Sequence, residues 1–174
     1  MTLVTDEQKA ALSVGEQVIV TKNRDDSFYP DLWVFQIVEG TPEEAMSVFA
    51  DFTIRKDYQP YVVGAEVLEG ADQSKATVAW DLNIPTLGRK QAVYQQELSS
   101  ADCKFQMRAE TIKPPVGYTS EVSTMSTERV VLKDRTVTLA TYATRLSASW
   151  WMPVVHTREK YFNSYKDMLM AFSK

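Results

Sequence analysis

The stretch from Thr41 to Leu68 constrains the fold most strongly, because it joins a capped helix to a strand through a short aromatic turn. Thr41 precedes Pro42, and Glu44 follows three residues after the threonine, which is the pattern of a capping box with proline at the first helical position. The apolar side chains of this segment have helical spacing and comprise Ala45, Val48, Phe49 and Phe52. We therefore predict a helix that Thr41 caps and that ends near Asp51.

A second short helix and a strand complete this stretch. Residues 54–58 are predicted to form a helical turn that Pro60 closes, and residues 61–68 the strand. Further strands are predicted over residues 32–38, 75–84, 90–98, 103–111, 119–132 and 136–148, with a hairpin turn at Lys133-Asp134 between the last two. A long helix is predicted over residues 154–172. The order strand, two short helices, run of strands, long helix indicates an α+β fold in which a curved sheet surrounds the last helix.

Residues 103–111 alternate most clearly between apolar and polar side chains. Cys103, Phe105, Met107 and Ala109 share one side of this strand, and charged or amide side chains share the other. This pattern is typical of a sheet with one buried and one solvated face. Cys103 is accordingly predicted to be a small buried side chain without a nucleophilic role.

The N-terminal segment, residues 1–30, is predicted to be an arm packed on a single domain that covers residues 31–174. Residues 5–12 have the composition of a short helix with Thr5 as its N-cap. Residues 17–22 alternate weakly, and two interpretations stay open, a strand or an arm along the sheet edge. The arm would cover an edge of the sheet or fill part of a cavity.

Composition narrows the classes of function. The 174 residues carry a net charge of −4, with a pI of about 5.1, which disfavours nucleic-acid binding. One cysteine and one histidine allow neither an internal disulfide nor a metal site of several thiolates or imidazoles. We predict no metal and no cofactor, although an all-carboxylate metal site stays open.

No apolar run is long enough to cross a membrane, which takes about 20 residues. The first 17 residues lack the basic start and apolar core of a signal peptide, so we expect a soluble protein, either cytoplasmic or exported after removal of a signal peptide that this chain lacks. Compartment and oligomeric state stay open.

The sequence resembles the START-like, or helix-grip, superfamily, which includes lipid-transfer START domains, coenzyme Q-binding proteins and polyketide cyclases (the SRPBCC proteins). The resemblance is carried by residues 41–51, by Tyr58-Gln59-Pro60-Tyr61 and by Trp151-Met152-Pro153, and it spans residues 32–172. It implies a bent antiparallel sheet wrapped around the C-terminal helix, with a cavity between them for an apolar or amphipathic ligand.

The resemblance turns the predicted inner side chains into candidate cavity walls. For each of them, ordinary core packing is the more frequent outcome. The candidates comprise Phe49, Phe52, Tyr58, Trp80, Tyr94, Phe105, Met107, Arg158, Tyr161, Tyr165 and Met168.

Two polar side chains near the last helix receive separate predictions. Arg158 falls on the inner stripe of that helix, where it would need an acceptor such as a ligand headgroup or Asp81. The more frequent outcome for such a side chain is that it reaches the rim of the cavity or pairs internally. His156 is expected to be a partly exposed surface residue, with a general base as the alternative. Of Trp150 and Trp151, one is expected to anchor the entrance to the helix, and the other to lie near the cavity mouth or touch a membrane transiently.

Three functions fit these observations. The preferred one is binding or transport of a hydrophobic small molecule such as a lipid, quinone or isoprenoid. The first alternative is an enzyme of the polyketide cyclase or aromatase kind that uses the same cavity. The second is a protein-interaction module that uses the outer face of the sheet or the N-terminal arm. No catalytic constellation is visible, so we predict no catalytic residue and lean against an enzyme.

Overall fold

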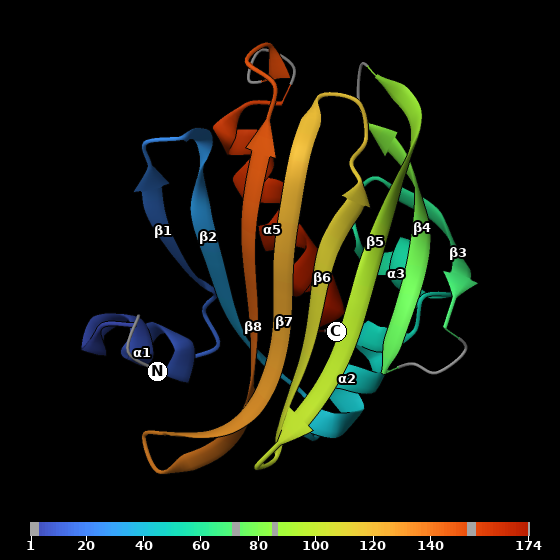
Figure 1. The fold of residues 1–174 in the computed structure, drawn as a ribbon. Helices are drawn as coiled ribbons and strands as arrows, with labels where there is room; N and C mark the ends of the chain where they lie inside the picture. The colour runs from blue at the N-terminus through green and yellow to red at the C-terminus, as the bar shows by residue number, and fades with distance from the viewer. Residues whose placement is uncertain (1–3, 71–73, 85–86, 153–155, 174) are drawn as a thin grey trace.

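The computed structural model contains one antiparallel sheet of eight strands and describes residues 4–70, 74–84, 87–152 and 156–173 (Figure 1). The strands are β1 (Val18–Arg24), β2 (Ser27–Val38), β3 (Val62–Glu69), β4 (Lys75–Ile84), β5 (Gly88–Ala101), β6 (Lys104–Lys113), β7 (Tyr118–Leu132) and β8 (Arg135–Ala148). The helices are α1 (Asp6–Ser13), α2 (Pro42–Ala50), α3 (Arg55–Tyr58) and α5 (Arg158–Phe172). This α+β arrangement of a curved sheet around a long C-terminal helix confirms the predicted fold class.

The strands follow the order β1-β2-β8-β7-β6-β5-β4-β3, so β1 and β3 are the two edges of the sheet. Each edge strand departs from regular pairing. The register of β1 against β2 shifts between Lys22 and Arg24, and that of β3 against β4 shifts twice, near Val62 and near Glu69. The sheet therefore stays open and ends on irregular strands.

Helix α2 begins as the sequence predicts, on a capping box. The backbone N–H of Thr41 donates to Glu44 Oε2 at 2.8 Å, and the N–H of Glu44 donates to Thr41 Oγ1 at 3.2 Å. These bonds satisfy two of the donors that a helix start leaves free. Helix α2 is thereby fixed across one end of the sheet, and α3 follows it after a short turn.

The main core lies between α2, α3, α5 and the inner face of the sheet (Figure 1). Leu32 and Val34 of β2 point into it, while Phe35, the next residue along, belongs to a second cluster under α1. Since successive side chains of a strand point to opposite faces, α1 covers the outer face of the sheet, where Leu12 is fully buried. The sheet is thus apolar on both faces near this edge.

The N-terminal residues are part of the sheet. β1 forms an edge strand, which is one of the two interpretations left open, and β2 starts at Ser27, ahead of the predicted Leu32. The difference arises at Pro30, because a proline in the sequence usually indicates that a strand does not continue through it. Here it lies between the β1 pairs Lys22–Asp31 and Arg24–Ser27, before pairing with β8 begins at Leu32.

Two boundaries correct the predictions. Cys103 is exposed and not buried, because β5 and β6 meet in a two-residue turn at Asp102 and Cys103, whose φ angles of 49° and 60° are both left-handed. Helix α5 begins at Arg158, where the side chain of Thr157 accepts from the N–H of Lys160, and not at residue 154. Residue 154 itself lies outside the described residues.

None of the described helices is both long and apolar enough to cross a membrane.

Candidate ligand-binding site

A cavity of about 110 Å³, partly open to solvent, lies between the inner face of the sheet and α5. Its described wall comprises Gln59, Pro60, Tyr61, Leu82, Ile84, Tyr94, Thr111, Pro115, Tyr118, Glu121, Leu146, His156, Lys160, Ser164, Tyr165 and Met168. Five strands, the turn before β3, the loop before β7 and the start of α5 all contribute to this wall. The space therefore lies where the helix-grip resemblance predicted it, between the sheet and the last helix.

The polar centre of the cavity is the carboxylate of Glu121 on β7. Its Oε1 accepts hydrogen bonds from Tyr165 at 2.8 Å and from Thr144 at 3.3 Å, and its Oε2 accepts from Tyr94 at 2.6 Å. The three donors come from α5, β8 and β5, so the acid links three elements. Because an ionised carboxylate only accepts, three converging hydroxyls hold it in one orientation.

A β-bulge brings Glu121 and Tyr118 to the same face of the sheet. Residues three apart on a regular strand point to opposite faces, yet both of these side chains line the cavity. The register of β7 against β8 shifts between Tyr118 and Ser120, which supplies the extra residue that reverses the alternation. Thr111 of β6 stabilises this point, since its hydroxyl accepts from the N–H of Glu121 at 2.8 Å and donates to the carbonyl at 3.2 Å.

Tyr118 and His156 form a second polar pair in the wall. The Tyr118 hydroxyl lies 2.7 Å from His156 Nδ1, and Nε2 is buried without a hydrogen-bond partner among the described residues. Burial lowers the pKa of His156 and raises the pKa of Tyr118. Both groups are therefore neutral at pH 7, and their hydrogen bond runs in the direction that the ring tautomer sets.

The tyrosines around Glu121 remain protonated donors. Burial raises the pKa of Tyr94 and of Tyr165 well above the usual range, and the neighbouring charge of Glu121 adds to the shift. Each of these hydroxyls therefore keeps its proton and donates it in a hydrogen bond to the carboxylate. The hydroxyl shell of Glu121 is therefore a fixed feature of the cavity.

The structure separates the predicted wall residues into three groups. Tyr94, Tyr165 and Met168 line the cavity. A larger group lies outside its described wall, in or against the main core, and comprises Phe49, Tyr58, Phe105, Met107 and Tyr161. Phe52 and Trp80 pack together, with ring centroids 5.8 Å apart, in a separate cluster at β3 and β4.

Arg158 does not lie on the inner face, which corrects its prediction. It is exposed, its Nε donates to the Phe28 carbonyl at 2.8 Å, and its guanidinium lies over the Phe28 ring. Asp81 is exposed as well and hydrogen-bonds Gln91. The helical spacing was correct for Tyr161 and Tyr165, but Arg158 is the first residue of α5 and turns toward the start of β2.

Among the described residues, Arg55 is the buried cation, and sequence reasoning missed it. Its Nε and Nη2 donate to the Phe49 carbonyl at 3.3 and 2.8 Å, and its guanidinium lies 3.9 Å from the centre of the Phe49 ring and 4.8 Å from that of Trp80. A carbonyl acceptor and two aromatic faces compensate its desolvation. Nothing in the sequence around residue 55 distinguishes it from a surface arginine of a short helix.

His156 was expected on the surface and lies in the cavity wall. Its signal would have been the neighbouring aromatic residues, since its ring lies near those of Tyr29, Tyr61, Tyr118 and Tyr161. These tyrosines come from distant parts of the chain, so only the fold assembles them. Of the two tryptophans, Trp150 is 90% exposed and Trp151 is half-buried.

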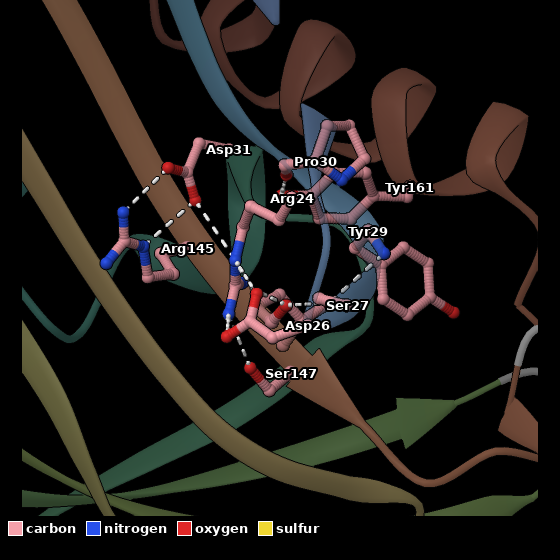
Figure 2. Close-up of polar contacts among 10 residues, drawn as sticks. Arg24, Asp26, Ser27, Tyr29, Pro30, Asp31, Arg145, Ser147 and Tyr161 are labelled. Carbon is pink, nitrogen blue, oxygen red and sulfur yellow. Dashed lines mark hydrogen bonds and ion pairs between the residues drawn. The ribbon is translucent and has the colours of Figure 1, made fainter. Parts of the chain in front are cut away.

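The first turn of α5, beside the cavity, is held by the start of β2. The Tyr161 hydroxyl donates to the Pro30 carbonyl at 3.2 Å, and the Tyr29 hydroxyl donates to the His156 carbonyl. Figure 2 shows the neighbouring Asp31 between Arg24 and Arg145. Asp31 accepts two hydrogen bonds from Arg145, at 2.9 and 2.8 Å, and lies 3.7 Å from Arg24.

Within the described residues, no group of three or more His, Cys, Asp or Glu side chains is placed to hold a metal ion. The cavity wall instead offers hydroxyls, one carboxylate, one imidazole and one lysine among apolar side chains. Such a set can bind and orient a small molecule, or move a proton.

Comparison with known proteins identifies the fold. No protein-family model and no curated protein sequence matches the chain. Solved structures do match. A STAR-related lipid transfer protein from Xanthomonas axonopodis superposes with a TM-score of 0.68 at 16% identity, over 91% of this chain and 94% of the other. The protein therefore has the START-like, helix-grip fold.

Two further structures show the range of this fold. Human STARD10 superposes with a TM-score of 0.63 at 12% identity, over 90% of this chain and 69% of its own. The Zhui aromatase/cyclase from Streptomyces sp. R1128 superposes with a TM-score of 0.52 at 14% identity, over 90% of this chain and 88% of its own. At these identities the likeness concerns the fold alone.

Proposed function

We propose that this protein binds or carries a hydrophobic or amphipathic small molecule, such as a lipid, quinone or isoprenoid, in the cavity between the sheet and α5. The observation that carries the proposal is the cavity itself, whose apolar wall includes Leu82, Ile84, Leu146 and Met168. A void between apolar side chains forfeits dispersion contacts unless a molecule fills it. The likeness to lipid-transfer structures supports the same kind of ligand.

The volume bears on the size of the ligand. Ligand pockets usually measure about 300–1,000 Å³, and this cavity measures about 110 Å³. A single acyl or isoprenoid chain fits this space better than a two-chain lipid. A longer ligand would extend through the open side or displace wall residues.

The test is ligand uptake by the full chain. Organic extraction and native mass spectrometry of freshly purified protein should find a bound apolar molecule, and the protein should take up a fluorescent single-chain lipid. Ser164 lines the cavity and the adjacent Asn163 is exposed, so Ser164→Trp should block uptake while Asn163→Trp should not. Failure of extraction and of uptake by the unmodified protein would refute the proposal.

An enzyme of the aromatase or cyclase kind is the second candidate. The observation that favours it is the convergence of neutral proton-carrying groups, His156 and Tyr118, with the carboxylate of Glu121 on one cavity. Positioned acids and bases of this kind can move protons on a folded substrate. The test is turnover of a poly-β-ketone analogue, with His156→Gln and Tyr118→Phe as variants. Unchanged turnover in both variants would exclude this mechanism.

A further inference from the structure

Glu121 places one carboxylate in a cavity wall that also holds Lys160 and His156. It is the one acidic side chain of the described wall, and no salt bridge joins it to a lysine or arginine among the described residues. Three neutral hydroxyls compensate its removal from water. A positively charged or hydrogen-bond-donating ligand group would complete that compensation.

The carboxylate of Glu121 has one more acceptor site than the three hydroxyls use. An ionised carboxylate has about four lone-pair sites, and the hydroxyls of Tyr165, Thr144 and Tyr94 use three of them. Oε1 receives two donors and Oε2 receives only one, so the open site is on Oε2. A single ligand donor at Oε2 would leave the three hydroxyl bonds in place.

The surroundings of this site suit an amphipathic molecule. Leu82 and Ile84 of β4, Leu146 of β8 and Met168 of α5 line the same cavity as the carboxylate and supply apolar contact. We propose that Glu121 selects ligands with a single apolar chain and a hydrogen-bond-donating head, an amine or an alcohol, and disfavours ligands with a carboxylate head. The inference rests on the proposed binding function and names the ligand class for it.

Three eight-carbon probes test the selection. Octylamine, octan-1-ol and octanoate have the same chain and differ in the head, and calorimetry at pH 7.5 measures their binding to the full chain. The amine and the alcohol should each bind at least about tenfold more tightly than octanoate, equivalent to about 1.4 kcal/mol. Octylamine is charged and octan-1-ol is not, although both donate hydrogen bonds. Comparing their affinities therefore shows whether the site requires a positive charge or only a hydrogen-bond donor.

Two variants assign the selection to Glu121. Glu121→Gln should reduce the ratio between the affinities for octylamine and for octanoate at least tenfold. Glu128→Gln removes the same charge from the same strand, at a position paired with Lys104 outside the described wall, and should keep the wild-type order. If Glu121→Gln does not fold, the order of the three probes on the wild-type protein still decides.

The outcomes separate this inference from the proposed function. Uptake of a fluorescent lipid together with equal or tighter binding of octanoate would overturn the selection by Glu121 and leave the carrier function standing. An equal effect of the two glutamine variants would also overturn it, because net charge would then explain the order. Absence of any ligand, including the fluorescent lipid, would overturn both.

Discussion

The Asp31 cluster joins β1, β2 and β8 and offers the sharpest test of how burial sets the stability that an ion pair contributes. Asp31→Asn removes a nearly buried charge that accepts two hydrogen bonds from Arg145 and faces Arg24 (Figure 2). The side chain of Asp31 is 8% exposed and that of Arg24 11%, whereas that of Arg145 is 62% exposed. The loss in free energy of unfolding on breaking these contacts should therefore lie between the loss for an exposed ion pair and the loss for a buried ion pair.

The magnitude follows from these exposures. Breaking a fully buried pair costs about 3–5 kcal/mol, and an exposed pair contributes less than about 1 kcal/mol. Arg145 regains water when its partner is lost, and Arg24 keeps its bonds to Asp26. We expect Asp31→Asn to lower the free energy of unfolding by about 2 kcal/mol, and Tm by about 4–8 °C for a domain of this size.

The assay is urea unfolding followed by circular dichroism, with thermal melts as a second measurement. Asp26→Asn is the matched control, because it removes a carboxylate from the same cluster whose side chain is 75% exposed. That variant should lose clearly less stability than Asp31→Asn, because an exposed ion pair contributes little. Equal losses in the two variants, or a loss below about 0.5 kcal/mol for Asp31→Asn, would refute the reasoning from burial.

Three further predictions address the rest of the molecule. Leu12→Ala should lower the free energy of unfolding by about 2–4 kcal/mol in urea, because Leu12 of α1 is fully buried against the outer face of the sheet; a loss below about 1 kcal/mol would show that α1 contributes little. Burial lowers the pKa of His156 below its usual value of 6.5. As the pH falls, the unfolded chain therefore binds a proton on this imidazole before the folded chain does. Stability should accordingly fall as the pH drops below about 6.5, and less steeply in His156→Gln; matching pH profiles would contradict this. Trp150→Ala should change stability by less than about 0.5 kcal/mol, since Trp150 is 90% exposed. The same variant should reduce co-sedimentation with anionic lipid vesicles if Trp150 makes the expected transient membrane contact, and unchanged co-sedimentation would exclude that contact.

Local sequence patterns predicted the elements that depend on local interactions. The capping box of Thr41 and Glu44 needs only neighbouring residues, so the start of α2 was found correctly. The alternation of Phe105, Met107 and Ala109 likewise gave the correct inner face of β6. Such signals repeat at the period of the element and survive in any tertiary context.

The polar part of the cavity could not be found in this way. Glu121 and Tyr118 share a face only because a bulge interrupts β7, and β-bulges leave no periodic signal. Tyr94 and Tyr165 were predicted as wall residues from the spacing of inner side chains on their strand and helix, but their shared bonds to Glu121 depend on three elements meeting. Long-range contacts of this kind are decided by strand register, which the sequence pattern of one strand does not fix.

The start of the last helix shows the same limit. Arg158 has the correct spacing for the inner face but lies in the first turn of α5, where the start of β2 offers the Phe28 carbonyl. His156 precedes the helix and falls among tyrosines from several strands. The predicted helix start was four residues too early. Arg158 was therefore placed on the inner face and His156 on the surface, which is the reverse of their positions in the structure.

The open sheet with its irregular edges has a consequence for how the protein behaves at high concentration. An exposed, regular edge strand invites a second chain to add its own strand, which leads to aggregation. Here β3 combines its register shifts with Glu66 and Glu69, and β1 combines its own with Lys22 and Arg24. Val63, Val67 and Leu68 are nevertheless exposed on β3. Replacing the two glutamates by valine would leave an uninterrupted apolar edge, and the expected result is self-association of folded chains.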